Sequence, residues 1–168
     1  MTWQTPDVVL ELVRKVGPIG LDPCTTKKNP TGARRFFTPR EDGLATSWEE
    51  SGLKVPYDAP ADELAYVNPP YGRGLPEWTG KVIAEGYAMR LSRKALVYLV
   101  PARTDTAWWR SASDNANARC LWRGRIRFKG ADAGAPFPSA FFYWGPRPHH
   151  FCDVFQDHGE VAVLRGGL

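Results

Sequence analysis

The hydrophobic residues near the start of the chain recur at helical spacing. Between residues 8 and 16 the apolar positions repeat at intervals of three and four, which predicts an amphipathic helix. Thr5 can cap this helix and Pro6 fits its first turn, because the first N–H groups of a helix lack partners within it. We expect Gly17-Pro18 to end the helix.

Short apolar runs bounded by turn residues predict the strands of a sheet. We expect these strands at residues 19–21, 64–67, 95–100, 139–144 and 160–164. Residues 119–128 have the pattern of two further strands joined around Arg123-Gly124. The segment 25–63 has many turn formers and no sustained period, so we expect it to be long and largely irregular.

Two more helices should occupy intervals between these strands. One is expected from Thr106 to about Asn115. The other is expected from Pro76 to about Met89, with one side formed by Trp78, Val82, Ile83 and Tyr87. Strands that alternate with helices in the first hundred residues indicate an α/β sheet that is mostly parallel, and the later hairpin-like strands indicate antiparallel additions.

The chain has the size of one domain. Its 168 residues suit a single hydrophobic core, and no repeat or linker divides them. With no apolar run long enough to cross a bilayer and no signal-like start, we expect a cytoplasmic protein. The three cysteines are odd in number and widely spaced, which favours neither a disulfide framework nor a zinc site.

The segment Asn68-Pro69-Pro70-Tyr71 carries the clearest chemical signal, because it directly follows an expected buried strand. Ligands of open α/β sheets bind beyond the carboxyl ends of the strands. An amide oxygen and a backbone carbonyl can accept hydrogen bonds from an exocyclic amino group, and two prolines stiffen the corner. The aromatic ring that follows offers a stacking surface for a planar substrate. The alternative is a proline-rich turn that contains an Asn and a Tyr.

A carboxylate stands at the end of the first expected strand, in Leu21-Asp22-Pro23-Cys24. Asp22 can pair with a positively charged group such as the ammonium of S-adenosylmethionine. A plain strand-to-turn corner is the alternative. Pro23-Cys24 is also similar to the nucleophilic cysteine of cytosine C5 methyltransferases, but the dipeptide lies where a ligand-binding corner after the first strand is expected.

The ordered motifs together resemble those of the small phage-type Dam-like DNA N6-adenine methyltransferases. The matching pieces are Trp3-Gln4-Thr5-Pro6, Leu21-Asp22-Pro23-Cys24, Asp42-Gly43-Leu44 with Trp48, Asn68-Pro69-Pro70-Tyr71-Gly72, Pro101-Ala102-Arg103-Thr104-Asp105-Thr106 with Trp108-Trp109, Gly124-Arg125-Ile126-Arg127-Phe128 and Pro138-Ser139. They cover most of the chain. Unlike larger methyltransferases, the chain has Pro23-Cys24 where a GxG would follow the first strand.

The resemblance implies a Rossmann-like class I methyltransferase fold that uses S-adenosylmethionine. It implies that Asn68, Pro69, Pro70 and Tyr71 form the catalytic corner, where the flipped adenine is held by its amino group and stacks on Tyr71. The residues that it places around the cofactor are Thr5, Pro6, Asp22, Pro23, Cys24 and Asn68, with Asp42 assigned either to the cofactor or to loop structure. Residues 1–168 would form one catalytic domain without a separate target-recognition domain.

Double-stranded DNA is the partner that this resemblance implies, and basic side chains are compatible with it. The net charge is only +4, so charge alone does not decide the partner. Candidate DNA contacts are Arg103, Thr104, Trp108, Arg125 and Arg127. Each candidate also has a structural alternative. Residues 103–106 could form a helix cap or an ion pair, and Trp108 could face the core. Arg125 and Arg127 could lie on a solvated strand face at 124–127.

Two other kinds of function stay open at this point. The NPPY corner also suits methylation of cytosine N4, RNA or a protein glutamine, and a catalytically silent DNA-binding module could retain the same fold. A metal site is not expected, because His149, His150, Cys152, Asp153 and His158 match no zinc spacing. The recognition sequence and the oligomeric state are not written in the sequence.

Overall fold

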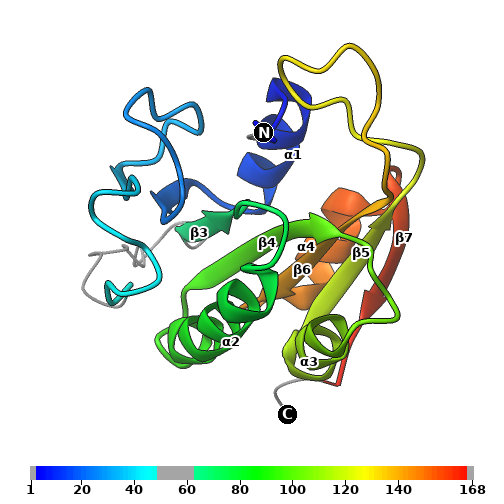
Figure 1. The fold of residues 1–168 in the computed structure, drawn as a ribbon. Helices are drawn as coiled ribbons and strands as arrows, with labels where there is room; N and C mark the ends of the chain where they lie inside the picture. Colours follow the sequence, from blue (N-terminus) through cyan, green and yellow to red (C-terminus); the bar gives the residue numbers. More distant parts are fainter. Residues whose placement is uncertain (1–2, 49–62, 166–168) are drawn as a thin grey trace.

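A computed structural model describes residues 3–48 and 63–165 of the chain. In this part of the chain seven strands form one sheet, in the order β2-β1-β3-β4-β6-β5-β7 (Figure 1). The strands are β1 (Ile19–Asp22), β2 (Arg35–Phe36), β3 (Leu64–Val67), β4 (Ala95–Pro101), β5 (Ala118–Trp122), β6 (Ser139–Trp144) and β7 (Gly159–Val163).

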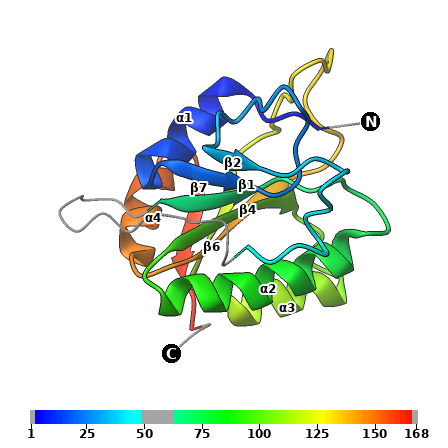
Figure 2. The ribbon, with the colours of Figure 1, turned by 90° about the vertical axis from the view of Figure 1, so that its left-hand side faces the viewer.

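Helices cover both faces of this sheet. They are α1 (Asp7–Val16), α2 (Leu75–Leu91), α3 (Ala107–Asn115) and α4 (Pro148–Phe155). The helices α1 and α4 contact each other on one face, and α2 and α3 contact each other on the opposite face (Figures 1 and 2). The expected α/β class is therefore confirmed, as a sheet between two helical layers.

The strand directions bring the functional motifs to one edge of the sheet. The strands β2, β1, β3 and β4 are parallel, whereas β6 is antiparallel to both β4 and β5. It follows that β5 runs in the same direction as β4, and that β1, β3, β4 and β5 all end at the same edge. The antiparallel additions that the sequence predicted are β6 and β7.

The strands β3, β4 and β6 are nearly continuous apolar runs because both of their faces are buried. In β3, Leu64 and Tyr66 join the core under α1 and α4, whereas Ala65 and Val67 join the core above α2 and α3. The same alternation continues in β4 and β6. Successive side chains of a strand point to opposite faces, so each strand contributes to both cores.

Most of the expected elements are confirmed within one or two residues: α1, α2, α3, β1, β3, β4, β6 and β7. The expected irregular segment is confirmed for residues 25–48 apart from the two-residue strand β2, while residues 49–62 lie outside the described part of the chain. No helix among residues 3–48 and 63–165 combines the length and the apolar character that a membrane span requires.

The expected second strand of 119–128 is wrong. Both edges of β5 are already paired, with β6 on one side and β7 on the other, so a hairpin partner has no edge to join. Residues 125–128 still alternate in burial, because Ile126 and Phe128 pack into the core. A single bridge between Gln4 and Lys129 replaces the expected ladder.

The sequence also missed helix α4, whose two buried residues are Phe151 and Phe155. Its short length, Pro146 before it and Pro148 at its first position concealed the helical period. The expected buried side of α2 is wrong at Tyr87, which is 59% exposed. Gly86 faces the sheet instead, because Trp144 lies so close that a Cβ on Gly86 would be 2.7 Å from its Cγ.

This contact predicts that two Gly→Ala substitutions in α2 have opposite effects. Gly86→Ala should destabilise the protein by about 1–2 kcal/mol, because overpacking against Trp144 outweighs the better helix propensity of alanine. Gly80→Ala should stabilise it by about 0.5–1 kcal/mol, because Gly80 is exposed and a Cβ there meets nothing within 4 Å. Urea denaturation measures both, and stabilisation by Gly86→Ala would contradict the close packing.

Candidate active site

A cavity of about 840 Å³ lies beyond the carboxyl ends of β1 and β3. Asp22 and Cys24 reach it from β1, Asn68 and Pro70 from β3, and Thr5 from the segment before α1. The parallel pairing of β1 with β3 therefore unites sequence motifs that are 46 residues apart. Pro23 and Asp42 also line the cavity.

Asp22 supplies a buried carboxylate to this cavity. Its Oδ1 accepts a hydrogen bond from the Cys24 N–H at 3.1 Å, and its Oδ2 accepts one from the Thr31 hydroxyl at 3.0 Å. Burial raises the pKa of Asp22 to about 6 in spite of these hydrogen bonds, which act in the opposite direction. The carboxylate is thus mostly ionised at neutral pH and available to a cation.

Asn68 has its two amide atoms in different situations. The Nδ2 group donates to the Trp3 carbonyl at 2.6 Å and to the Thr5 hydroxyl at 3.0 Å. The Oδ1 atom is buried and has no hydrogen-bond partner within the described part of the chain. A buried acceptor without a partner is costly, so this oxygen is the atom that a ligand with an N–H group can satisfy.

Thr5 does not cap α1, so this expectation is wrong. Pro6 occupies the position before the helix, and its carbonyl accepts hydrogen bonds from Val9 and Leu10. The Thr5 side chain turns away from α1 to contact Asn68 and the Tyr66 hydroxyl, the latter at 2.8 Å. Pro6 is not among the cavity-lining residues, whereas Thr5 is.

Tyr71 lies in an aromatic cluster next to the corner. Its hydroxyl donates to the Leu99 carbonyl at 3.4 Å, and its ring meets Phe128 and Phe137 at interplanar angles of 81° and 80°. Trp3 packs against the same two phenylalanines. The loop between β5 and β6 thus closes over the corner, and Figure 1 shows its yellow part beside α1.

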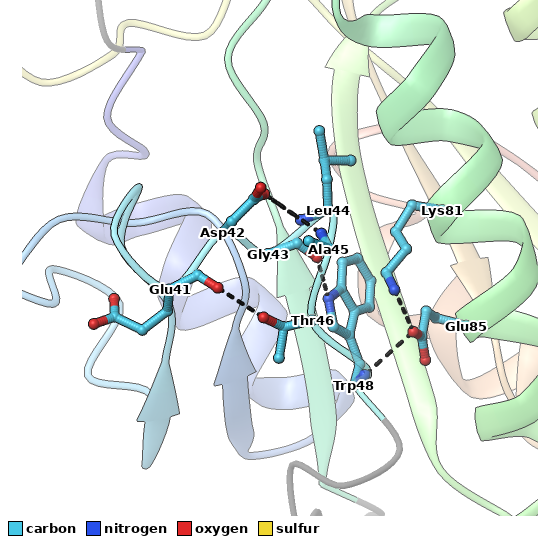
Figure 3. A network of polar contacts seen from close by, with 9 residues as sticks. All are labelled: Glu41, Asp42, Gly43, Leu44, Ala45, Thr46, Trp48, Lys81 and Glu85. Carbon is cyan, nitrogen blue, oxygen red and sulfur yellow. Dashed lines mark hydrogen bonds and ion pairs between the residues drawn. The ribbon is translucent and has the colours of Figure 1, made fainter.

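The wall of the cavity near Asp42 is a tight turn (Figure 3). Asp42 has a φ of 50°, and its Oδ1 accepts hydrogen bonds from the Leu44 and Ala45 N–H groups at 3.1 and 3.4 Å. The Trp48 indole donates to the Gly43 carbonyl at 2.8 Å. Asp42 therefore stabilises this turn. Of the two roles expected for Asp42, cofactor binding or loop structure, these hydrogen bonds correspond to loop structure.

Side chains of helix α2 contact Trp48 and hold the same turn in place. The Trp48 N–H donates to Glu85 Oε1 at 3.2 Å, and Lys81 forms an ion pair with Glu85 at 2.8 Å (Figure 3). Trp48 is fully buried, and the Lys81 ammonium lies 5.6 Å from the centre of its ring. The turn is thereby anchored to the helix that follows the NPPY corner.

The residues predicted to contact DNA lie outside the cavity. Arg103 and Thr104 are exposed just after β4, and Arg125 and Arg127 are exposed after β5, at the same edge as Asn68. Arg127 also donates to the Asp132 carbonyl at 2.9 Å. Trp108 is half-buried, which leaves part of its ring accessible at this end of the sheet.

Some structural alternatives at these positions are present as well. Trp109 is the tryptophan that faces the core, where it packs against Phe142. Thr106, not Thr104 or Asp105, caps α3 by accepting a hydrogen bond from the Trp109 N–H.

Of the cysteine and histidine candidates, Cys24 lines the cavity, whereas the histidines of α4 lie apart from it. Burial raises the pKa of the Cys24 thiol well above its usual value, so the thiol stays protonated, unlike a nucleophilic cysteine. His149 and His150 lie in the first turn of α4, which follows the far end of β6, and His150 Nε2 lies 3.0 Å from the Lys15 carbonyl. Residues 3–48 and 63–165 contain no group of three His, Cys, Asp or Glu placed to hold a metal ion.

The α/β architecture and a cavity at the strand ends are consistent with a methyltransferase. The chain belongs to the Dam family, described as DNA N-6-adenine-methyltransferase, whose family model matches residues 1–141. The family indicates a DNA adenine N6-methyltransferase, and thus a DNA substrate. A comparison with curated proteins finds no match.

Three further residues belong to the site that the sequence motifs did not predict: Tyr66, Thr31 and Phe137. Tyr66 precedes Asn68 by two positions in the same extended segment, so its side chain points to the same face, and this spacing was a usable signal. No comparable local signal marks Thr31 or Phe137, because each reaches the site through a long loop.

The turn at Gly43 makes a specific prediction. A Cβ on Gly43 would lie 1.9 Å from the Pro23 carbonyl oxygen, so Gly43→Ala must displace either the turn or the corner at Pro23. We expect a loss of about 2 kcal/mol or more in thermal or urea unfolding. Gly74→Ala is the control, because its Cβ would meet Trp78 at an ordinary 3.8 Å and should change stability by less than about 0.5 kcal/mol. Equal stability of the two variants would contradict the close approach.

Proposed function

We propose that this chain transfers the methyl group of S-adenosylmethionine to the N6 amino group of an adenine flipped out of double-stranded DNA. The observation that carries the proposal is the buried Asn68 Oδ1, which has no partner within the described residues while Nδ2 has two. An exocyclic amino group is a donor that fits such an acceptor. Membership of the Dam family supplies the substrate class.

The cavity fits the proposed cofactor in size and in chemistry. Its volume of about 840 Å³ lies within the range of about 300–1,000 Å³ usual for small-molecule sites. When bound, S-adenosylmethionine supplies a methyl group on a positively charged sulfur together with an ammonium group. Asp22 offers the anionic partner, and Thr5, Pro23, Cys24, Asp42 and Asn68 form the surrounding walls.

The sheet order supports a Rossmann-like class I methyltransferase fold. The strands β2, β1, β3 and β4 lie side by side and run parallel. The next strand in the sheet, β6, is antiparallel and separates β4 from β5. The cavity lies beyond β1 and β3, where open α/β sheets bind their ligands.

In the proposed mechanism the corner binds and polarises the target amino group. Asn68 Oδ1 and the Pro69 carbonyl accept its two N–H bonds, which raises electron density on nitrogen and aims the lone pair at the methyl group. The prolines restrict the backbone, and Tyr71 stacks on the base. The bound cofactor would supply its methyl group to this lone pair, and the proton that the nitrogen releases would pass to water.

The exposed side chains beyond β4 and β5 would hold the DNA. Arg103, Thr104, Arg125 and Arg127 are placed to contact phosphates or base edges, and the accessible part of Trp108 offers a stacking surface. A base has to leave the duplex to reach a buried acceptor such as Asn68 Oδ1.

Asn68→Ala should abolish methyl transfer while preserving the fold. Unmethylated DNA is incubated with the protein and S-adenosylmethionine, then digested, and its nucleosides are separated by mass. We expect N6-methyladenine from the unaltered protein and at least about a hundredfold less from Asn68→Ala, the scale of removing an oxyanion-hole donor. Asn115→Ala is the matched control, because Asn115 is exposed and, among residues 3–48 and 63–165, its side chain bonds only its own helix, at the Ser111 carbonyl.

Full activity of Asn68→Ala would contradict the mechanism. N4-methylcytosine as the sole product would contradict the substrate. A protein that binds DNA but neither binds S-adenosylmethionine nor forms a product would be the silent module.

The raised pKa of Asp22 predicts how cofactor affinity depends on pH. Protonation below about pH 6 neutralises the carboxylate, so the affinity for S-adenosylmethionine should be lost as the pH falls, by up to about tenfold per pH unit. Asp22→Asn should bind S-adenosylmethionine more weakly at pH 7.5, and its affinity should lack this pH dependence. Any pH dependence that remains in this variant comes from titration of S-adenosylmethionine itself and can be subtracted. Titration calorimetry between pH 5 and 8 measures both, and an identical pH profile for the two proteins would argue against the ion pair.

A further inference from the structure

We infer that the Thr5 hydroxyl is a positioning group that, together with the Trp3 carbonyl, holds the Asn68 amide in one orientation, and that it is not a ligand of the cofactor. This inference rests on the proposed function, in which Asn68 Oδ1 must face the target amino group. It assigns to the segment before α1 a part in methyl transfer that is separate from cofactor binding.

An asparagine amide can face either way, because its oxygen and nitrogen ends have nearly the same shape. The Trp3 carbonyl removes this ambiguity, since it can only accept and lies 2.6 Å from one end of the Asn68 amide. That end must be Nδ2, because the opposite orientation would place two acceptor oxygens in contact. The Thr5 hydroxyl at 3.0 Å takes the second N–H, so the Asn68 amide group has both of its donors committed.

Thr5 Oγ1 is itself held in place by Tyr66. The two hydroxyls are 2.8 Å apart, and both side chains are buried. Burial raises the pKa of Tyr66, so the phenol stays protonated at physiological pH. Whichever hydroxyl donates in this pair, Thr5 Oγ1 keeps a lone pair for the Asn68 Nδ2 group.

The backbone that carries Thr5 and the Trp3 carbonyl is tied to the loop after β5. The Lys129 N–H donates to the Gln4 carbonyl at 2.9 Å, and the Trp3 indole packs against Phe128. Lys129 also forms an ion pair with Asp7 at 2.5 Å. The segment is therefore anchored on both sides of Thr5.

These contacts predict that the hydroxyl matters for rate more than for cofactor affinity. Thr5→Val has almost the same shape but lacks the hydroxyl, so one of the two bonds that orient Asn68 is lost. We expect kcat for methyl transfer to fall about 5- to 10-fold, the size of one neutral hydrogen bond. The Kd for S-adenosylmethionine should stay within about twofold, which is small beside that loss.

Two further variants separate positioning from simple destabilisation. Thr5→Ser retains the hydroxyl and should recover most of the lost rate. Because Thr5→Val leaves the buried Tyr66 hydroxyl without its partner, the Val substitution is also made in a Tyr66→Phe background, where the same loss in kcat is expected. An NMR spectrum of the side-chain amides provides a direct reading: the Asn68 NH₂ signal, identified by its absence in Asn68→Ala, should move in Thr5→Val and return in Thr5→Ser.

An unchanged kcat and an unchanged Asn68 signal in Thr5→Val would overturn the positioning role. A large rise in the Kd for S-adenosylmethionine, with kcat at saturating cofactor unaffected, would also overturn it and make Thr5 a cofactor ligand. Both outcomes differ from failure of the proposed function, in which Asn68→Ala itself would retain full activity.

Discussion

The hydrogen bonds from Asn68 Nδ2 to the Trp3 carbonyl and the Thr5 hydroxyl join the segment before α1 to the edge of the sheet. They use both donors of the amide and leave Oδ1 buried without a partner within the described part of the chain. The fold accepts the cost of that unpaired atom, which is on the order of 1–3 kcal/mol. In the proposed mechanism the substrate removes this cost when its amino group binds, so recognition is strongest at the atom that reacts.

The sheet provides the frame for this arrangement. Parallel pairing of β1 with β3 brings the Asp22 carboxylate and the Asn68 amide to one cavity, and the continuation of β4 and β5 in the same direction places exposed arginines at that edge. The loop after β5 closes the aromatic cluster around Tyr71 and holds the Trp3 segment. In the proposed function, the cofactor cavity, the target corner and the exposed arginines therefore lie at the same edge of the sheet.

Much of this arrangement could be predicted from the sequence, because buried parallel strands leave strong local signals. Examples are the apolar runs that form β3 and β4, and the position of Asn68 directly after β3. Features that depend on distant contacts could not be predicted. Thr5 had the local pattern of a helix cap, but Tyr66 and Asn68, more than sixty residues away, bind its hydroxyl. The alternating segment 125–128 resembled a strand, but β7 already occupied the free edge of β5.

The central claim is that the Asn68 amide is already set, before DNA binds, to accept the target amino group. A crystal structure of the protein with a DNA duplex and the demethylated cofactor product would test it most directly. We expect the adenine N6 to lie about 3 Å from both Asn68 Oδ1 and the Pro69 carbonyl, with Nδ2 still bonded to the Trp3 carbonyl. A flipped base held elsewhere, or an Asn68 that presents Nδ2 to it, would contradict the account.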